Sequence, residues 1–481
     1  MNDHASRPLS KINLVQGMHG PEFAAARARY LAKIPMREAL YDPCQPNAKQ
    51  LSLIGCLSEF GYSQLVKASL GGHLTFQEAF AATCYILRAS NGHLERRFHC
   101  LKDASLGPDG DCMAAREMLS GLAMKEAWAE LTPDEVAGMV TAAQMDIIHF
   151  PDYGPRVLET CGMGGDRGMM VNGDPVRRKT INCSTLSALT VASLGHRTAK
   201  HGSYSNTSAV GSTEAIENLG VIVDIPKRDV QEELAMSGFH FTDAHAWKTI
   251  HDLSHLLPRR ETVNHVIGPM TPPVSPATRL DKVIGVNEKM HPETIARAYA
   301  RLHADGVYNV GNVAVVCGLS QHIDAHEAIN SRHIRDLAVL DELSPFASLM
   351  SFTARDEFLA NVVLTPASFG LMFRDPMSVF VPNEEAMIME ANRIAVHLGC
   401  DDRDRQLVEY LAMNAGLALY LTNGMMDDDL ARFRAGRGPD SEKLAHCAWI
   451  CLEALREGRV SAFLASQVQL TCKASGRFNA Q

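Results

Sequence analysis

The stretch Glu159–Asp166, which reads ETCGMGGD, is the part of the sequence that decides the fold. It ends a short apolar run that begins at Arg156, and it holds glycines at three of the four positions from 162 to 165. Glycines after a strand let backbone N–H groups approach a phosphate without a side chain in the way. The spacing is not the dinucleotide-binding fingerprint, and no Gly-Lys-Ser/Thr follows as it would in a P-loop. Taken alone, the stretch fits a plain tight turn equally well.

A polar cluster opens the next predicted helix. Residues Asn182–Thr185, with the sequence NCST, precede an apolar stretch from Leu186 to Leu194. The free N–H groups and the dipole at a helix N-terminus attract anions. An ordinary helix cap needs one polar residue, whereas this helix start offers three. The pattern therefore favours an anion site over a simple cap.

A lysine and a hydroxyl-rich loop follow a further short strand, predicted over Arg197–Lys200. The chain continues from Lys200 as KHGSYS and then, over Asn206–Ser212, as NTSAVGS. A cation followed by hydroxyl groups and glycines suits phosphate oxygens. The alternative is a solvated Ser/Thr loop with no ligand.

The first part of the chain is predicted to be helical. We expect residues 1–21 to be a polar tail, and residues 22–150 carry helix patterns that predict a small helical domain. Thr75 with Glu78 predicts a capped helix start, and Leu131–Glu135 repeats that logic with a proline at the first helical position. Residues 107–111 are rich in turn formers.

From residue 151 the sequence changes character. Short β-branched or apolar runs alternate with helical stretches, which predicts an α/β domain over residues 151–481 with a mainly parallel central sheet. Long helices return towards the end. The runs are Arg156–Thr160, Gly220–Val223 and Asn312–Cys317, and the late helices are Arg405–Thr422 and Ser441–Glu457.

Composition narrows the class of protein. The chain has 481 residues, of which 46% are hydrophobic and 21% charged, with a net charge of -9. That acidic balance argues against a general nucleic-acid binder. No apolar run approaches the roughly 20 residues that span a bilayer, and the N-terminus lacks the pattern of a signal peptide. The twelve scattered cysteines fit packing in a reducing cytoplasm.

In their order along the chain, the motifs resemble a known family. Gly-x-Gly-Gly-Asp, Asn-x-Ser-Thr, Lys-His-Gly and Gly-Ser-x-Glu resemble the phosphoribosyl-diphosphate site of anthranilate phosphoribosyltransferases. Later blocks agree and extend the resemblance over about residues 72–463. They are Gly268–Thr271, Leu340–Ser344, Leu364–Leu371 and Asn414–Tyr420. The ordered set is far more specific than any one motif.

The resemblance implies an activity and a set of site residues. The activity is transfer of a 5-phosphoribosyl group from phosphoribosyl diphosphate to the nitrogen of anthranilate or a related aromatic acid, in a Mg²⁺-dependent homodimer. Pyrophosphate, ribose and phosphate contacts would come from Gly162, Gly165, Asp166, Asn182, Ser184, Thr185, Lys200, Ser208 and Ser212. Mg²⁺ would be held by Ser184, Asp341 and Glu342, and Lys200, Asp341 and Glu342 would serve the chemistry. Around the acceptor would lie His201, Gly202, Ser203, Arg259, Arg260 and Gly268.

The chain departs from the family pattern at several points. Ser203 stands where the family has the asparagine that touches the acceptor, and Met163 replaces a threonine in the glycine loop. An insertion at 167–180 contains Arg177, Arg178 and Lys179 and is either a lid over the phosphates or a solvated basic loop. A second insertion occupies 319–339.

Two alternative functions stay open at this stage. A pyrimidine-nucleoside phosphorylase would share the fold but needs no paired metal carboxylates, which Asp341 and Glu342 argue against. A non-catalytic, nucleic-acid-binding relative is disfavoured by the net charge of -9. His251 and His255 have the helical spacing of a zinc pair, but we expect such histidines to shape the acceptor pocket or face solvent.

Overall fold

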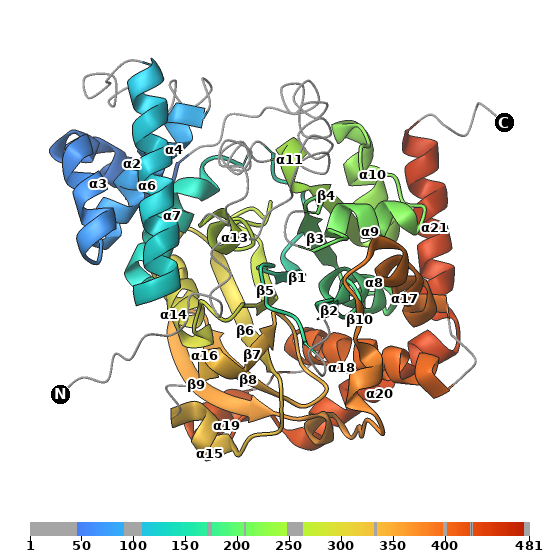
Figure 1. The fold of residues 1–481 in the computed structure, drawn as a ribbon. Coiled ribbons are helices and arrows are strands. Elements are labelled where there is room, and N and C mark those ends of the chain that lie inside the picture. Colours follow the sequence, from blue (N-terminus) through green and yellow to red (C-terminus); the bar gives the residue numbers. More distant parts are fainter. Residues whose placement is uncertain are drawn as a thin grey trace.

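The computed structural model describes residues 46–90, 108–147, 149–170, 176–205, 208–247, 263–330, 334–397, 402–423, 425 and 427–475. An N-terminal group of helices packs against an α/β body built on one large sheet (Figure 1). The mixed α/β class with a mostly parallel sheet agrees with the prediction.

The helical region contains α2 (Ala48–Gly55), α3 (Tyr62–Gly71), α4 (Phe76–Ser90), α6 (Pro108–Ala129), α7 (Pro133–Gln144) and the 3-10 helix η2 (Leu57–Glu59). The predicted start of α4 is confirmed, because Thr75 N donates to Glu78 Oε2 at 2.8 Å and Glu78 N donates back to Thr75 Oγ1. Thr132 and Glu135 form the same capping box at α7. The turn predicted over 107–111 is wrong, since Pro108 begins α6. Proline suits the first turn of a helix, and α6 gains packing against α3 and α4.

The sheet order is β4-β3-β1-β5-β6-β8-β9, with β7 also paired to β6. Strands β4, β3, β1, β5 and β6 are parallel, and β7, β8 and β9 run antiparallel to their neighbours. The strands are β1 (Arg156–Gly162), β3 (Thr198–Gly202), β4 (Phe239–Asp243), β5 (Arg279–Gly285), β6 (Asn309–Leu319), β7 (Ala338–Leu340), β8 (Ala347–Ala354) and β9 (Glu357–Leu364). A two-stranded sheet joins β2 (Arg178–Lys179) to β10 (Val381–Pro382).

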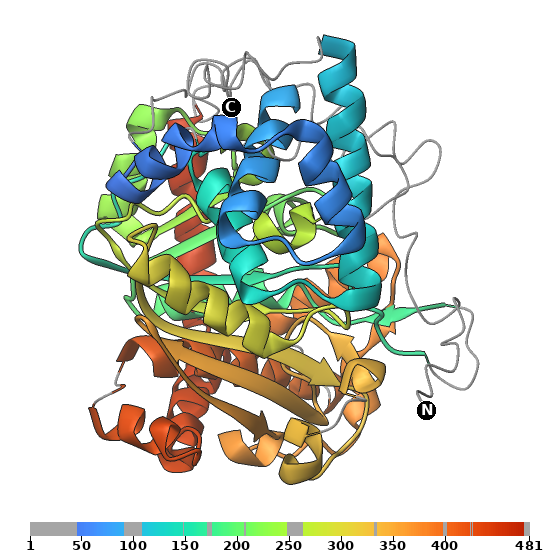
Figure 2. The ribbon, with the colours of Figure 1, turned by 90° about the vertical axis from the view of Figure 1, so that its left-hand side faces the viewer.

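Both faces of the sheet are covered, so the molecule has two cores. Along β6, Val313 and Val315 join one core while Ala314 and Val316 join the other, as strand alternation requires. On the first face α14 (Pro292–Ala304) packs between the sheet and α7. On the second face lie α8 (Cys183–Ser193), α17 (Glu385–His397), α18 (Asp402–Asn423), α20 (Ser441–Arg456) and α21 (Arg459–Ala474). In the view turned by 90°, the helical region lies in front of the sheet, and α14 lies beneath that region (Figure 2).

The remaining elements are short. They are α9 (Ser212–Asn218), α10 (Lys227–Ser237), α11 (Ala244–Trp247), α13 (Asn264–Ile267), α15 (Ala325–Asn330), α16 (Ile334–Leu337), α19 (Asp427–Arg434), η4 (Pro366–Phe369) and η5 (Pro376–Val379). The strand suggested by Gly220–Val223 is absent from this described segment, which runs without regular structure. Val221 and Val223 are buried, and Ile222 N donates to Thr471 Oγ1 of α21 instead of to a sheet neighbour. The two late helices are confirmed as α18 and α20.

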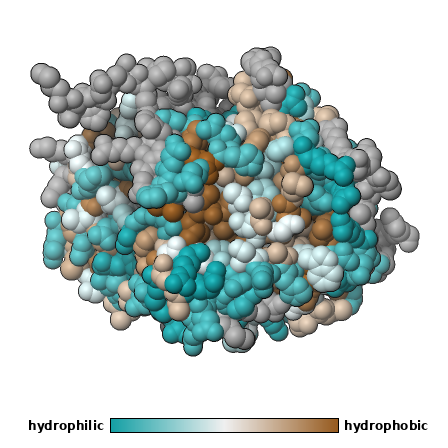
Figure 3. Space-filling view, turned by 90° about the horizontal axis from the view of Figure 1, so that it is seen from below, coloured by the Kyte–Doolittle hydropathy of each residue, from teal (hydrophilic) through white to brown (hydrophobic). Residues whose placement is uncertain are grey.

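Within the described ranges, no helix has both the length and the apolar character needed to cross a bilayer. The face seen from below is mainly hydrophilic, with a strip of hydrophobic residues across its centre (Figure 3).

Candidate functional site

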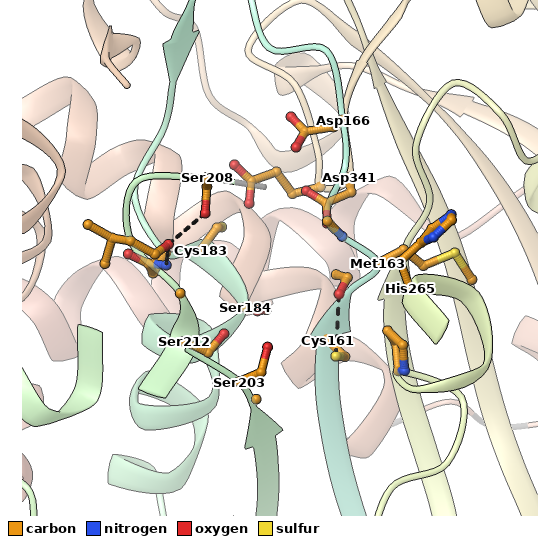
Figure 4. Close-up of a pocket in the computed structure, with 18 of the residues that line it drawn as sticks. Cys161, Met163, Asp166, Cys183, Ser184, Ser203, Ser208, Ser212, His265 and Asp341 are labelled. Carbon is orange, nitrogen blue, oxygen red and sulfur yellow. Dashed lines mark hydrogen bonds between the residues drawn. The ribbon is translucent and has the colours of Figure 1, made fainter. Parts of the chain in front are cut away.

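A cavity of about 210 Å³ opens where β1 and β3 end. The carboxyl edge of a parallel sheet is the usual place for a ligand in α/β proteins. Twelve of the predicted residues line it, namely Gly162, Asp166, Asn182, Ser184, His201, Gly202, Ser203, Ser208, Ser212, Gly268, Asp341 and Glu342. Figure 4 shows Asp166 and Asp341 at one end and Ser203, Ser212 and Cys161 towards the other.

The glycine loop is shaped by the segment that carries Asp341. Gly164 and Gly165 both have φ of 68°, a left-handed conformation that favours glycine. At Gly162 an added Cβ would lie 2.2 Å from Asp341 Oδ2, so a larger residue there would displace this carboxylate. Gly164 N donates to the same carboxylate oxygen at 2.6 Å. The loop and Asp341 therefore form one unit.

Three carboxylates meet beside this loop. Burial, with the neighbouring Asp341, raises the pKa of Glu342 to about 8, and burial, with Asp166, raises the pKa of Asp341 to about 6. Thr180 and Tyr410 donate hydrogen bonds to Glu342 Oε1, the latter at 3.0 Å. Buried Asp166 Oδ2 has no hydrogen-bond partner among the described residues. Hard oxygens with excess negative charge and an unused lone pair suit a divalent cation such as Mg²⁺.

Two hydrogen bonds between a pair of asparagines fix the start of α8. Asn182 N donates to Asn392 Oδ1, and Asn392 Nδ2 donates to Asn182 Oδ1, both at 2.8 Å. Asn182 Nδ2 also donates to the Val210 carbonyl at 3.2 Å. Because its side chain makes these contacts instead of capping α8, Asn182 joins the helix start to the hydroxyl-rich loop. Thr185 is fully buried at that helix start and does not line the cavity.

The hydroxyl-rich loop is also tied to the C-terminal part of the chain. Ser208 Oγ donates to the Val210 carbonyl at 2.7 Å, and Ala209 N donates to Asn383 Oδ1 at 3.0 Å. Asn383 N in turn donates to the Arg177 carbonyl of the first insertion. Ser212 begins α9 and lines the cavity.

Lys200, predicted to contact phosphate, is buried and lies outside the lining of the cavity. Its Nζ donates to the His201 carbonyl and lies 5.8 Å from the centre of the Phe241 ring, and burial lowers its pKa. The lysine that lines the cavity is Lys179, which pairs with Asp166. In the sequence, Lys179 belongs to the basic run Arg177–Lys179 of the first insertion, and that run was the feature that pointed to it.

The two insertions contact each other directly before Asp341. Arg167 Nε donates to the Ala338 carbonyl at 3.0 Å, and Gly168 N donates to the Val339 carbonyl at 2.8 Å. The first insertion is further anchored through β2 and β10. The described part of this insertion is thus fixed beside the carboxylates, and Lys179 reaches the cavity from it.

The opposite end of the cavity is lined by His201, Gly202, Ser203, Gly268 and residues that were not among the predicted site residues. These are Cys161, Tyr204, Ala244, Asn264, His265 and Pro269. His265 Nε2 lies 2.7 Å from Glu126 Oε1 of α6, so this end adjoins the helical region. Arg259, Arg260, His251 and His255 lie outside the described residues.

The sequence of this chain is similar to those of known transferases. The family model described as "Glycosyl transferase family, a/b domain" matches residues 154–329. The anthranilate phosphoribosyltransferase of Geobacillus thermodenitrificans is 30% identical over 296 residues, which cover 60% of this chain and 74% of that protein. The bifunctional protein TrpGD of Thermotoga maritima is 28% identical over 314 residues, which cover 64% of this chain and 46% of that protein.

Solved structures agree on the fold. Anthranilate phosphoribosyltransferase from Thermus thermophilus has a TM-score of 0.57 at 22% identity, covering 85% of this chain and 98% of that one. The Saccharomyces cerevisiae enzyme in complex with PRPP and Mg has a TM-score of 0.53 at 19% identity, covering 88% and 98%.

Proposed function

This chain belongs to the anthranilate phosphoribosyltransferase family, and on that premise we propose that it transfers a 5-phosphoribosyl group from phosphoribosyl diphosphate to the nitrogen of anthranilate or a related aromatic acid, releasing pyrophosphate. The observation that carries the proposal is the convergence of the glycine loop, the start of α8 and three buried carboxylates on one cavity.

The donor would occupy the carboxylate end of the cavity. Backbone N–H groups of the glycine loop and of the α8 start would receive phosphate oxygens, together with Ser184, Ser208 and Ser212. Lys179 would add a cation at the cavity wall, and buried Lys200 would act through its charge from behind the wall. These groups stabilise the charge that builds on the departing pyrophosphate.

Asp341 and Glu342, with Ser184 and Asp166 nearby, would hold Mg²⁺ together with the diphosphate. When bound, Mg²⁺ neutralises charge on the leaving group. The acceptor nitrogen would approach the ribose from the end lined by His201, Ser203 and Gly268, where positioning supplies much of the rate enhancement.

The direct test follows the loss of anthranilate fluorescence in the presence of phosphoribosyl diphosphate and Mg²⁺. We expect turnover that stops when the metal is chelated. If another aromatic amine turns over and anthranilate does not, the proposed reaction type is supported but anthranilate is not the acceptor. Metal-independent phosphorolysis of thymidine or uridine would instead favour the nucleoside phosphorylase.

We further propose a cytoplasmic homodimer built from a small domain at 22–150 and an α/β domain at 151–481. The family resemblance supports the dimer. Light scattering of the purified chain would test it, and a monomer at micromolar concentration would contradict it.

A further inference from the structure

A lysine of the first insertion lies among the carboxylates at one end of the cavity. The ammonium of Lys179 pairs with Asp166 Oδ1 and also donates to the Asp166 carbonyl at 3.1 Å. Both side chains are at most 10% exposed. The other oxygen of this carboxylate, Oδ2, is buried and has no hydrogen-bond partner among the described residues. Asp166 therefore binds a cation through one oxygen and keeps the second for another ligand.

The backbone around Lys179 is fixed on both sides. β2 pairs with β10, and Arg178 N and Met169 N each donate to the carbonyl of the other residue, at 2.8 and 2.9 Å. Directly after the lysine, Thr180 Oγ1 donates to Glu342 Oε1. The first insertion thus brings an ammonium and a hydroxyl group to two different carboxylates.

Three carboxylates influence one another at this end of the cavity. We call Asp166, Asp341 and Glu342 the carboxylate cluster, of which the two aspartates are visible together in Figure 4. Burial and then Asp166 raise the pKa of Asp341 to about 6, whereas the charge of Lys179 acts in the opposite direction. Lys179 therefore offsets part of the repulsion within the cluster.

The charge of Lys179 limits the positive charge that the cluster can still take up. With all three carboxylates ionised around a metal, the cluster carries three negative charges, and the ammonium of Lys179 reduces this to two. One divalent cation balances that remainder. A second would leave excess positive charge in buried surroundings that screen charge poorly.

We propose that the ammonium of Lys179 takes the place of a second divalent cation in the carboxylate cluster, so that the cluster binds a single divalent ion when no donor is present. Lys179 is then a positioning residue for the metal. It holds Oδ1 of Asp166 and leaves Oδ2, together with Asp341 and Glu342, for the ion. The assignment of the cluster to Mg²⁺ rests on the proposed function.

A second interpretation is that Lys179 only braces the first insertion against Asp166. The two interpretations predict opposite effects on metal affinity. Loss of a brace would distort the cluster and weaken metal binding. Loss of a competing cation would strengthen it, because the incoming ion no longer meets a positive charge beside the same carboxylates.

The first measurement is a titration with Mn²⁺ at pH 7.5 without donor, in which electron paramagnetic resonance reports the unbound ion. The wild type should bind one Mn²⁺ per chain. Lys179→Gln should bind Mn²⁺ about tenfold more tightly or better, because an ammonium beside the ion is removed, and should accept a second ion. Lys179→Arg keeps the charge and should resemble the wild type.

The matched control is Lys473→Gln, which makes the same chemical change at an exposed lysine of α21. It should leave Mn²⁺ binding unchanged. Equal or weaker binding in Lys179→Gln would overturn the proposal. So would a wild type that binds two ions or none, and this outcome is read without any variant.

Melting temperatures separate loss of charge from general damage. Without metal, Lys179→Gln should melt below the wild type, since the carboxylates lose their counter-cation. Saturating Mn²⁺ should raise the melting temperature of this variant more than that of the wild type, because the variant binds the ion more tightly. A deficit that Mn²⁺ leaves unchanged would mean that Lys179 is a brace, and would contradict the proposal.

Turnover is measured separately, so that the proposed function can fail by itself. If neither anthranilate nor another aromatic amine is converted, the proposed function fails, while the Mn²⁺ titrations still decide the role of Lys179. If anthranilate is converted and Lys179→Gln gains no affinity for Mn²⁺, the proposed function is supported and the role of Lys179 as a substitute cation is rejected.

Discussion

At the scale of single residues, the buried Glu342 should make stability depend on pH. Its folded pKa of about 8 is raised, mainly by burial and then by Asp341. A raised carboxyl pKa contributes stability below its unfolded value of about 4.3, and that stability is lost as pH rises towards 8. Without divalent cations, we expect the free energy of unfolding to fall between pH 5 and 8.5. Glu342→Gln should remove most of that fall, on the order of 2 kcal/mol, as measured by urea unfolding.

The exposed Glu384 provides the control for this prediction, because Glu384→Gln makes the same chemical change outside the site. It should leave the pH dependence intact. Mg²⁺ should raise the melting temperature of the wild type at pH 8.5 and have a much smaller effect on Glu342→Gln. A wild-type stability that does not vary over this pH range would contradict the raised pKa of Glu342.

Residue by residue, the sequence predicted which side chains gather at the cavity better than it predicted how those side chains are oriented. Asp341 and Glu342 were identified by the resemblance alone, since a lone acidic pair has no distinguishing pattern. Lys200 and His201 are neighbours on β3, and successive side chains on a strand point to opposite faces. Once His201 lines the cavity, Lys200 turns away from it. The strand bounds needed to apply that rule came only with the fold.

At the scale of elements, the packing of α4 against α7 depends on Gly138. A Cβ there would lie 2.3 Å from the Phe76 carbonyl oxygen and 3.0 Å from Ala79 Cβ. Because backbone cannot yield as a side chain can, Gly138→Ala should destabilise the protein by about 1–3 kcal/mol through overpacking. Thermal unfolding would measure it as a lower melting temperature.

Gly55 offers the matched control at the end of α2, since its added Cβ would meet nothing within 4 Å. Gly55→Ala should be neutral or slightly stabilising because alanine favours helix. Equal melting temperatures for the two variants would show that the helices adjust, and that the close approach is not required.

Elements were predictable where local chemistry decides them. Thr75 with Glu78 and Thr132 with Pro133 marked helix starts correctly, because a capping box is a local arrangement. The prediction of elements failed where packing against segments distant in the sequence decides the local structure. Pro108 starts a long helix that α3 and α4 stabilise, and Gly220–Val223 is held by α21 in place of a strand neighbour.

At the scale of the whole molecule, the second insertion connects the helical region to the α/β body. Arg335 of α16 donates to Glu130 Oε1 at 2.8 Å and to the carbonyls of Glu288 and Lys289, each at 2.7 Å. Close by, Glu126 pairs with His265 of the cavity lining. Burial alone would raise the pKa of Glu126, but His265 and Lys289 lower it below its usual value. The geometry of the acceptor end of the cavity therefore depends on the position of the helical region.

Removing the Arg335 side chain should loosen this junction without unfolding the sheet. In Arg335→Ala, we expect faster hydrogen exchange over the C-terminal turns of α6 and over residues 286–290, because three charge-assisted or carbonyl contacts are lost together. Exchange in β5 and β6 should stay slow. Since positioning of the acceptor suffers, the KM for anthranilate should rise about tenfold while that for phosphoribosyl diphosphate changes little. The matched control is Arg393→Ala, which removes an exposed arginine paired with Glu390 on α17. It should change neither the hydrogen exchange nor the KM for anthranilate. Faster exchange throughout the sheet would mean general destabilisation, and unchanged exchange in α6 would mean that Arg335 does not connect the two parts.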